Sequence, residues 1–413
     1  MIAILLIGLG FFGCELQAFS GKKPSVRPEF DREIRVHLGA YDTAAVNSSG
    51  EIIVECYREG RRAEIFYTSS VIGVFRYRKG LAVRDQNGTL AMGLSLAIFR
   101  PRFPNVFLDF GGKRYRGGIE CDLDYGEASV DKKVRVFNLI DVELYLRGVL
   151  PGEIGDRTPD EFEAAKAQAI ASRTYAIWRL STQATDRHLK SSIEDQLYLG
   201  ATAEIPLLNE AVEQTSGMIM TYDKKPIAAY YHAICGGSTS PIQKIWGGKR
   251  IPYLIGALDG DYCQWARVFF WNEKYKVKDL QESLSKYFGA KGQIPKKGFG
   301  RIVLLKFEKD PSLGRMARLE VRTTTGEFVV ESDQIRWALS RPSVPGAKLP
   351  STRFNERVIK SKGQIEALEL SGAGNGHGVG MCQCGAIGRA RAGASCDEIL
   401  QHYYEGIQID KIY

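Results

Sequence analysis

The stretch VLPGEIGDRTPDEFEAAKAQAIASRTYAIWRL, residues 149–180, contains a carboxyl group followed along the sequence by two cations. The carboxyl group belongs to Glu153, which follows a proline and a glycine that predict a short turn and has apolar neighbours. Partial burial there would raise the pKa of the carboxyl group and favour the protonated state that a general acid requires. Glu153 is therefore a candidate catalytic acid, and an exposed turn glutamate is the alternative interpretation.

The cations are Lys166 and Arg173, on the alanine-rich helix expected after this turn. Seven residues at 100° each bring them back to within about 20° of the same direction. Lys166 could pair with Glu163, whereas no carboxylate lies one helical turn away from Arg173. Small residues on another side of the helix would let a neighbouring element pack closely. The pattern fits one wall of a groove or a solvated basic face.

A second group of polar residues lies in the glycine-rich stretch GAGNGHGVGMCQCGAIGRARAG, residues 372–393. Alternate glycines remove side chains from this loop, so a ligand or a neighbouring backbone could come close to His377 and Gln383. The stretch is not a phosphate-binding P-loop, because no GK[ST] follows its glycines. His377 and Gln383 are candidate binding residues, and a structural hydrogen-bonding role for the histidine is equally consistent with the sequence.

A third group contains His232 and Cys235 in an H-x-x-C step, with Cys263 further along the chain. These three could bind zinc and leave the fourth position to water, substrate or another residue. Cys235 and Cys263 could instead form a disulfide if the protein is exported. Eight cysteines are too few for a disulfide framework in 413 residues. Both interpretations stay open.

The pattern of apolar residues predicts an α+β protein. Residues 33–140 alternate β-branched and aromatic residues with polar ones, which is typical of short strands. Thr158, Pro159 and Glu161 then predict the start of a helix that runs to about residue 181. We expect a second helix near 205–216 and strands in MIMTYD and IAAYYHAI.

The C-terminal part of the chain is expected to return to helix after a β-leaning insert. Ser395 and Glu398 form a capping box, and Gly406 is suited to a helix C-terminus. A groove is expected between the β-rich parts and a helical core. The expected segments are an export or lipoprotein-type segment (1–20), a linker (21–32), a β-rich N-terminal region (33–140), a core in two parts (141–265 and 346–413) and a β-rich insert (266–345).

The first residues, MIAILLIGLGFFGCELQAFS, favour an export signal, because the apolar run is too short to span a bilayer. FFGC also resembles a lipoprotein cleavage box, which would place a lipid on Cys14. The alternative is a dinucleotide site at the glycines of GLGFFG, but Gly21, Pro24 and Pro28 leave too little helix for it. The net charge of +8 is scattered and does not indicate nucleic acid.

Several ordered motifs resemble the SpoIID/LytB family of bacterial cell-wall proteins, which includes the sporulation lytic transglycosylase SpoIID. The resemblance runs from about residue 33 to the end of the chain. Its motifs are DVELYLRGVLPGEI, EAAKAQAIASRTYAI, AAYYHAICGGSTS, LPSTRF, GHGVGMCQCGAIGRARAG and ILQHYYEG.

The resemblance implies that Glu153 is the catalytic acid of the family's V-P-x-E motif. It also implies that Lys166 and Arg173 line the active cleft, and Gln168 and Tyr175 match the same helix motif. About two extra residues separate the acid from the helix. A second departure is Cys384, which stands where an aromatic residue is usual.

The implied reaction is cleavage of the glycosidic bond after N-acetylmuramic acid in peptidoglycan glycan strands. The 6-hydroxyl of that sugar attacks its own anomeric carbon and gives a 1,6-anhydro end, so one carboxyl group acts first as acid and then as base, where hydrolysis needs two. This chemistry requires no cofactor, although zinc is implied for some members. The protein would be exported to the periplasm or cell envelope, where its partners would be glycan strands and other cell-wall hydrolases. The alternative is a non-catalytic peptidoglycan-binding module that recruits or activates an amidase, and a third hypothesis is a zinc amidase using His232, Cys235 and Cys263.

Overall fold

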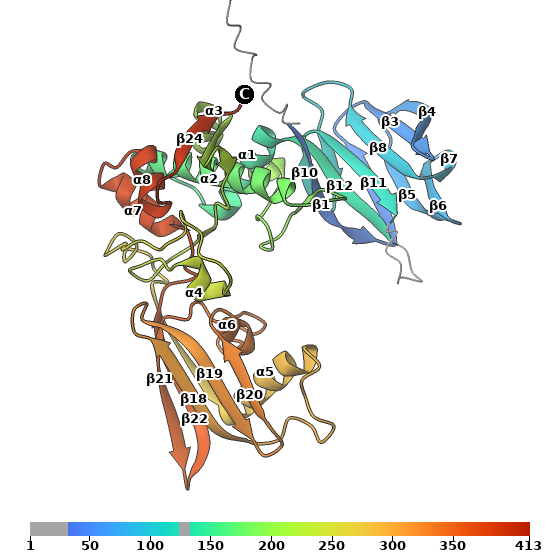
Figure 1. The fold of residues 1–413 in the computed structure, drawn as a ribbon. Coiled ribbons are helices and arrows are strands. Elements are labelled where there is room, and N and C mark those ends of the chain that lie inside the picture. Colours follow the sequence, from blue (N-terminus) through green and yellow to red (C-terminus); the bar gives the residue numbers. More distant parts are fainter. Residues whose placement is uncertain (1–31, 124–132) are drawn as a thin grey trace, which may run out of the picture. The chain divides into compact units, whose positions relative to one another are not determined.

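The computed structural model describes residues 32–123 and 133–413 (Figure 1). The expected export segment with Cys14, the alternative glycine motif and nearly all of the linker 21–32 lie outside the described residues. Arg32–Tyr413 forms one compact unit. In the part of the chain that the structure describes, no helix has the length and apolar character needed to cross a bilayer.

The N-terminal region forms two β-sheets, as its alternating pattern predicts (Figure 1). The seven-stranded sheet has the order β13-β1-β12-β11-β8-β3-β4, and the six-stranded sheet has the order β10-β9-β2-β5-β6-β7. Their strands are β1 (Glu33–Tyr41), β2 (Thr43–Ser48), β3 (Ile52–Arg58), β4 (Arg61–Thr68), β5 (Ile72–Tyr77), β6 (Gly80–Asp85), β7 (Gly88–Leu94), β8 (Leu96–Pro101), β9 (Leu108–Phe110), β10 (Lys113–Tyr115), β11 (Gly118–Leu123), β12 (Val134–Asp141) and β13 (Leu189–Lys190).

In several of these strands every second residue is buried, because side chains point alternately to the two faces of a strand. In β3, Ile52, Val54 and Cys56 are fully buried while the residues between them are not. The sheets contact each other through β12 with β2 and β5, and through β11 with β6. β12 runs directly into the first helix, so this region fixes where that helix begins.

Among the described residues, the helical core contains α1, α2, α3 and α4 before the insert, α7 and α8 after it, and two small sheets. β14 pairs with β15 and β24, while β16 pairs in parallel with β23. The elements are α1 (Val142–Glu153), the 3-10 helix η1 (Pro159–Glu161), α2 (Phe162–Ser181), the 3-10 helix η2 (Ala201–Ala203), α3 (Pro206–Gln214), β14 (Met218–Tyr222), β15 (Lys225–Pro226), β16 (Tyr231–His232), α4 (Ile242–Trp246), β23 (Met381–Cys382), α7 (Gln383–Arg391), α8 (Cys396–Tyr403) and β24 (Gln408–Lys411).

The centre of this core is α2, of which fourteen of twenty residues are buried. Its alanines leave room for neighbours on every side, and it contacts α1, α3, α7, α8 and β14. A helix that is buried all round has no solvent-facing stripe. The expectation that α2 presents one cationic face to a groove is therefore not met by its packing.

The insert has its own hydrophobic core, which includes Leu284, Phe288, Leu319, Phe328 and Leu368. One three-stranded sheet has the order β17-β22-β21 and the other β18-β19-β20. The elements are β17 (Phe270–Lys276), α5 (Val277–Ala290), β18 (Ile302–Asp310), β19 (Arg315–Thr323), β20 (Glu327–Glu331), α6 (Gln334–Ala338), β21 (Phe354–Ser361) and β22 (Gln364–Ala373).

The α+β expectation is confirmed, and the differences from the expected elements are local. The helix start at Thr158 is confirmed as η1 followed by α2, and the capping box of Ser395 and Glu398 begins α8. IAAYYHAI forms only the two-residue strand β16, and β24 was not expected. The insert contains the helix α5, and it pairs β17 with β22, which lies beyond residue 345. The segment boundaries themselves stay predictions.

Candidate functional site

Glu153 is the last residue of α1, and not part of a turn ahead of a helix as the sequence suggested. Pro151 and Gly152 lie in the final turn of this helix. A side chain at Gly152 would meet the carbonyl oxygen of Leu197 at 2.7 Å, so only glycine lets the segment around Leu197 come this close. The Leu197 backbone N–H consequently donates to Oε1 of Glu153 at 2.8 Å.

The other oxygen of Glu153 faces Gln383, the first residue of α7. Nε2 of Gln383 donates to Oε2 of Glu153 at 3.5 Å and to Oε1 of Gln168 at 3.3 Å. Gln168 is fully buried, and its own Nε2 donates to the hydroxyl of Ser172 at 2.9 Å. Gln168 therefore orients Gln383, and Gln383 contacts the carboxyl group directly.

Burial raises the pKa of Glu153 above its ordinary value, and hydrogen bonds from Leu197, Gln383 and Tyr231 only partly offset this effect. The C-terminal end of a helix also disfavours negative charge. No cation among the described residues lies within ion-pair distance of this carboxyl group. Burial without a cationic partner is the environment that keeps a carboxylic acid protonated.

Glu153 lines a cleft of about 970 Å³. The cleft is also lined by aromatic side chains, which include Tyr175, Tyr230, Trp246 and His377. The ring of Trp246 lies 4.9 Å from those of both Tyr230 and His377. Flat rings beside a few polar groups suit a ligand that has both apolar faces and hydroxyl groups.

The other carboxylates that line this cleft are all ion-paired. Asp195 binds Arg179 at 2.9 Å, and Asp333 binds Arg336 at 3.0 Å. Glu194 is in contact with Lys190. Among the residues described for this cleft, Glu153 is therefore the carboxyl group without a cationic partner, and it is the one best suited to hold a proton.

Tyr175 and His377 lie in the cleft, as expected of binding residues. The hydroxyl of Tyr175 donates to Asp195 at 3.1 Å. Nδ1 of His377 accepts from the Val379 N–H at 3.1 Å, and its Nε2 lies 3.0 Å from the carbonyl oxygen of Tyr231. Burial lowers the pKa of His377 to about 4, so the imidazole is neutral at neutral pH. It can shape the cleft without adding charge.

Lys166 and Arg173 do not line this cleft. Arg173 is fully buried, where its guanidinium donates to both oxygens of Glu143 in α1 at 2.8 and 2.6 Å. Lys166 forms an ion pair with Glu163 at 2.5 Å on its own helix. The prediction that Lys166 and Arg173 form a cationic wall of the groove is therefore wrong. The partner of Arg173 lies in a neighbouring helix, so a search of positions one turn away on the same helix cannot find it.

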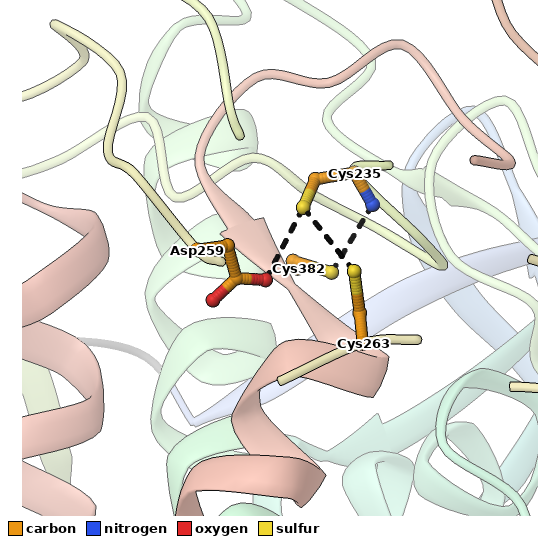
Figure 2. Close-up of side chains that lie close together, drawn as sticks. All are labelled: Cys235, Asp259, Cys263 and Cys382. Carbon is orange, nitrogen blue, oxygen red and sulfur yellow. Dashed lines mark hydrogen bonds between the residues drawn. The ribbon is translucent and has the colours of Figure 1, made fainter. Parts of the chain in front are cut away.

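Three thiols and a carboxylate converge in the interior of the protein (Figure 2). Cys235, Asp259, Cys263 and Cys382 are all buried, and their ligand atoms lie within 4.8 Å of one another. Sγ of Cys235 lies 3.5 Å from Sγ of Cys263 and 3.2 Å from Oδ2 of Asp259. Figure 2 shows these side chains pointing toward one another from separate segments. Cys235 and Cys263 are free thiols, so the disulfide alternative is not present.

This donor set fits a metal such as zinc. Sulfur atoms on a tetrahedral zinc with bonds of about 2.3 Å lie about 3.8 Å apart, close to the observed spacing. Backbone N–H groups of Cys235 and Gly385 point at Sγ of Cys382, at 3.2 and 3.3 Å. Oδ1 of Asp259 accepts from the Tyr403 hydroxyl at 2.8 Å, which leaves Oδ2 toward the thiols. Such outer hydrogen bonds orient metal ligands.

The predicted ligand set changes in two ways. His232 lies outside the cluster, with Nδ1 3.2 Å from the carbonyl oxygen of Val379. Cys382 and Asp259 join Cys235 and Cys263 instead. Cys382 and Asp259 do not belong to a short metal-binding motif that the sequence could reveal. Cys382, for example, lies 147 residues after Cys235 in the chain. Cys384, although close to Cys382 in the sequence, is not in the cluster.

Comparison with known proteins identifies the family. The profile of the SpoIID family, described as stage II sporulation protein, matches residues 130–222, which include α1 and α2. An uncharacterised protein of Brachyspira hyodysenteriae is 30% identical over 276 residues, covering 66% of this chain and 68% of that protein. The chain belongs to the SpoIID family. A domain of unknown function (DUF8618) matches residues 260–380, the region of the insert.

Other SpoIID-family relatives are similar over a comparable part of this chain. The amidase enhancer of Bacillus subtilis is 30% identical over 63% of this chain, which spans 39% of that relative. Stage II sporulation protein D of Bacillus subtilis is 27% identical over 66% of this chain and 75% of that protein. Membership of the SpoIID/LytB family implies a role related to the cell wall. The SpoIID match contains Glu153, whereas Gln383 and the cluster residue Cys382 lie beyond it.

Proposed function

We propose that this SpoIID-family protein is a peptidoglycan lytic transglycosylase with Glu153 as its single catalytic residue for proton transfer. The observation that carries the proposal is a buried carboxyl group with a raised pKa and no cationic partner, at the wall of a large cleft lined with aromatic rings. The substrate class is the glycan strand of peptidoglycan, and the protein acts in the periplasm or cell envelope.

The reaction needs one proton donor that becomes a proton acceptor. Glu153 donates its proton to the glycosidic oxygen while the bond from that oxygen to the anomeric carbon breaks. The 6-hydroxyl of the same N-acetylmuramic acid forms a new bond to the anomeric carbon, and its proton passes to the Glu153 carboxylate. The N–H groups of Leu197 and Gln383 stabilise that carboxylate between the two transfers. No water molecule is consumed.

The test is incubation of the purified full chain with peptidoglycan glycan strands, followed by mass spectrometry of the ends. We expect 1,6-anhydro ends from the wild type and a loss of about 100-fold or more for Glu153→Gln. Glu213→Gln, on the exposed side of α3, is the matched control and keeps full activity. Wild-type protein that yields no anhydro ends, or a Glu153→Gln variant that yields as many, would exclude the proposal.

A second candidate function is suggested by the similarity to the amidase enhancer. A non-catalytic module would bind glycan strands and stimulate a separate amidase without cutting the glycan. Binding and stimulation would then survive Glu153→Gln, and no product with a new end would form. The experiment adds a purified cell-wall amidase to wild type and to Glu153→Gln. Measuring the amidase activity and the glycan cleavage products in each mixture separates the two functions.

For the metal, we propose a structural zinc held by Cys235, Asp259, Cys263 and Cys382. Four buried protein ligands leave no open position for water or substrate, which is typical of structural and not catalytic zinc sites. The zinc amidase hypothesis is for this reason less well supported. When bound, zinc would cross-link the segments that carry its ligands. One of these segments ends in Cys382, the residue directly before Gln383, so the site would help hold α7 beside Glu153.

A further inference from the structure

The cleft has a second wall that is formed by the insert and by the residues directly after it, and this wall lies outside the matched SpoIID domain. We propose that Trp337 and Lys348 of this wall bind a carboxylate-bearing sugar of the glycan strand, with the sugar ring stacked on the indole and the carboxylate paired with the ammonium group. The inference rests on the proposed glycan substrate of the same cleft. It assigns a role to the domain of unknown function, whose match contains both residues.

Trp337 is available for such a contact. It lies in α6, and half of its surface is exposed (50%), which is unusual for so large an apolar side chain. Nζ of Lys348 lies 4.0 Å from the centre of the Trp337 ring, so the two side chains form one composite surface. A ring with an adjacent cation matches a ligand that has an apolar face and a negative group.

Lys348 lacks a counter-ion in the part of the chain that the structure describes. The neighbouring cation Arg336 is already paired with Asp333 at 3.0 Å and donates to the Leu349 carbonyl oxygen at 3.0 Å. Partial burial, followed by the charge of Arg336, lowers the pKa of Lys348, and the charge of Asp333 only partly offsets this effect. A partly desolvated ammonium group gains more from an incoming carboxylate than a solvated one does.

Backbone contacts hold this pair at the cleft. Lys348 bridges to Ser340, and the Leu349 N–H donates to the Arg336 carbonyl oxygen at 2.9 Å, which ties the segment to α6. The Gly376 N–H donates to the Pro350 carbonyl oxygen at 2.8 Å, and Gly376 lines the same cleft as Glu153. The binding pair and the acid are therefore connected through the glycine-rich loop that contains His377.

The space beyond Trp337 favours a chain and not a single sugar. A second cavity of about 400 Å³ is lined by Trp337, Lys348, Ile193 and Asn375, which also line the cleft at Glu153. The two spaces share these side chains, so a ligand that occupies both would pass over the composite surface. An oligosaccharide has the required length, and peptidoglycan has the required carboxylates.

The experiment measures binding with the Glu153→Gln background, which removes turnover. Three ligands share the same sugar backbone: strands without peptides, which carry lactyl carboxylates; strands with peptides, which carry peptide carboxylates; and chito-oligosaccharides, which carry none. We expect Lys348→Gln to weaken binding of at least one carboxylated ligand by about tenfold and to leave chito-oligosaccharide binding unchanged. The ligand that responds identifies the source of the carboxylate.

We expect Trp337→Ala to weaken binding of all three ligands by about tenfold, because stacking does not depend on charge. Lys296→Gln and Phe270→Ala, both exposed in the insert, are the matched controls. Equal effects of Lys348→Gln on charged and uncharged ligands, or unchanged binding by Trp337→Ala, would overturn the inference. A wild type that binds selectively but forms no anhydro ends would instead refute the transglycosylase alone.

Discussion

The backbone N–H of Leu197 reaches Oε1 of Glu153 at 2.8 Å because Gly152, between them, has no side chain. A methyl group at Gly152 would lie 2.7 Å from a backbone carbonyl oxygen, which cannot swing away as a flexible side chain could. We expect Gly152→Ala to displace the segment and lower the rate of glycan cleavage by about tenfold or more. Gly289→Ala in α5 is the control, because the nearest atom to the added methyl group is the end of the flexible Ile294 side chain, at 3.4 Å. Equal rates for both variants would contradict this account of the acid.

The pKa of Glu153 predicts how stability and activity depend on pH. Burial raises this pKa, so the folded state favours the protonated form. The stability that the group contributes is then fully present below the pKa of an unfolded glutamate, about 4.3, and is lost as the pH rises through the native pKa. We expect the melting temperature of Glu153→Gln to rise relative to wild type over this interval.

The rate of cleavage should fall over the same pH interval, because the acid loses its proton. Melting curves and rates measured from pH 4 to pH 8 on the same preparations test both expectations together. A melting difference that does not change with pH would show that the carboxyl group is not desolvated in the folded protein.

Gln383 gives a second way to shift this titration. Its Nε2 lies 3.5 Å from Oε2 of Glu153, so Gln383→Glu places a second carboxyl group beside the acid. Like charges at this distance raise the pKa of one member of the pair. We expect the alkaline fall in the rate to move to higher pH. The same change at the exposed Gln401 of α8 is the control. A pH–rate profile that coincides with wild type would show that the two side chains are not in contact.

The ion pair between Arg173 and Glu143 predicts a structural role for this arginine. Burial alone would raise the pKa of Glu143, but the hydrogen bonds and charge of Arg173 hold that pKa below its ordinary value. This contribution to stability is present above the pKa of an unfolded glutamate and is lost as the pH falls through the native pKa. We expect Arg173→Met to lower the free energy of unfolding by about 3–5 kcal/mol, since it leaves a buried charge without a partner.

Urea unfolding measures this loss, and Arg267→Met at an exposed position is the control. The double variant Arg173→Met with Glu143→Leu should recover part of the stability, because it removes both charges. If Arg173→Met unfolded at the same urea concentration as wild type and lost only glycan binding, the arginine would belong to the substrate site instead.

The four-residue cluster predicts a bound metal. We expect about one zinc ion per purified chain by elemental mass spectrometry, and much less for Cys263→Ser and Asp259→Asn. Chelation should lower the melting temperature of wild type but not of Cys263→Ser. Cys384→Ser is the matched control, because Cys384 is close in sequence to a ligand but outside the cluster. A zinc content of the wild type no higher than background would contradict the prediction that the cluster binds a metal.

Features that depend on neighbouring residues could be predicted from the sequence. The strands of the N-terminal region follow from alternation, and the start of α8 follows from Ser395 and Glu398, whose capping contacts span three residues. Glu153 was found because a proline, a glycine and apolar residues surround it. The predicted turn at Pro151 and Gly152 is instead the last turn of α1, because a proline in the last turn of a helix has the same sequence pattern as a proline in a loop.

Features that depend on distant residues could not be predicted. The carboxylate that binds Arg173 is thirty residues away in another helix, so the expected cationic face was already neutralised inside the core. Asp259 and Cys382 approach Cys235 from separate segments, and no spacing rule connects them. The position of Lys348 also depends on packing, because the neighbouring residues Leu349 and Pro350 contact α6 and the glycine-rich loop.

The strand β16 pairs with β23, although about 150 residues, including the whole insert, lie between them. Gln383 follows β23 immediately and is made 230 residues after Glu153. A polypeptide still being synthesised therefore contains Glu153 long before it contains the amide that contacts it. On the proposed mechanism, cutting can begin only once the late segment has folded against the early one, so the order of translation would delay it.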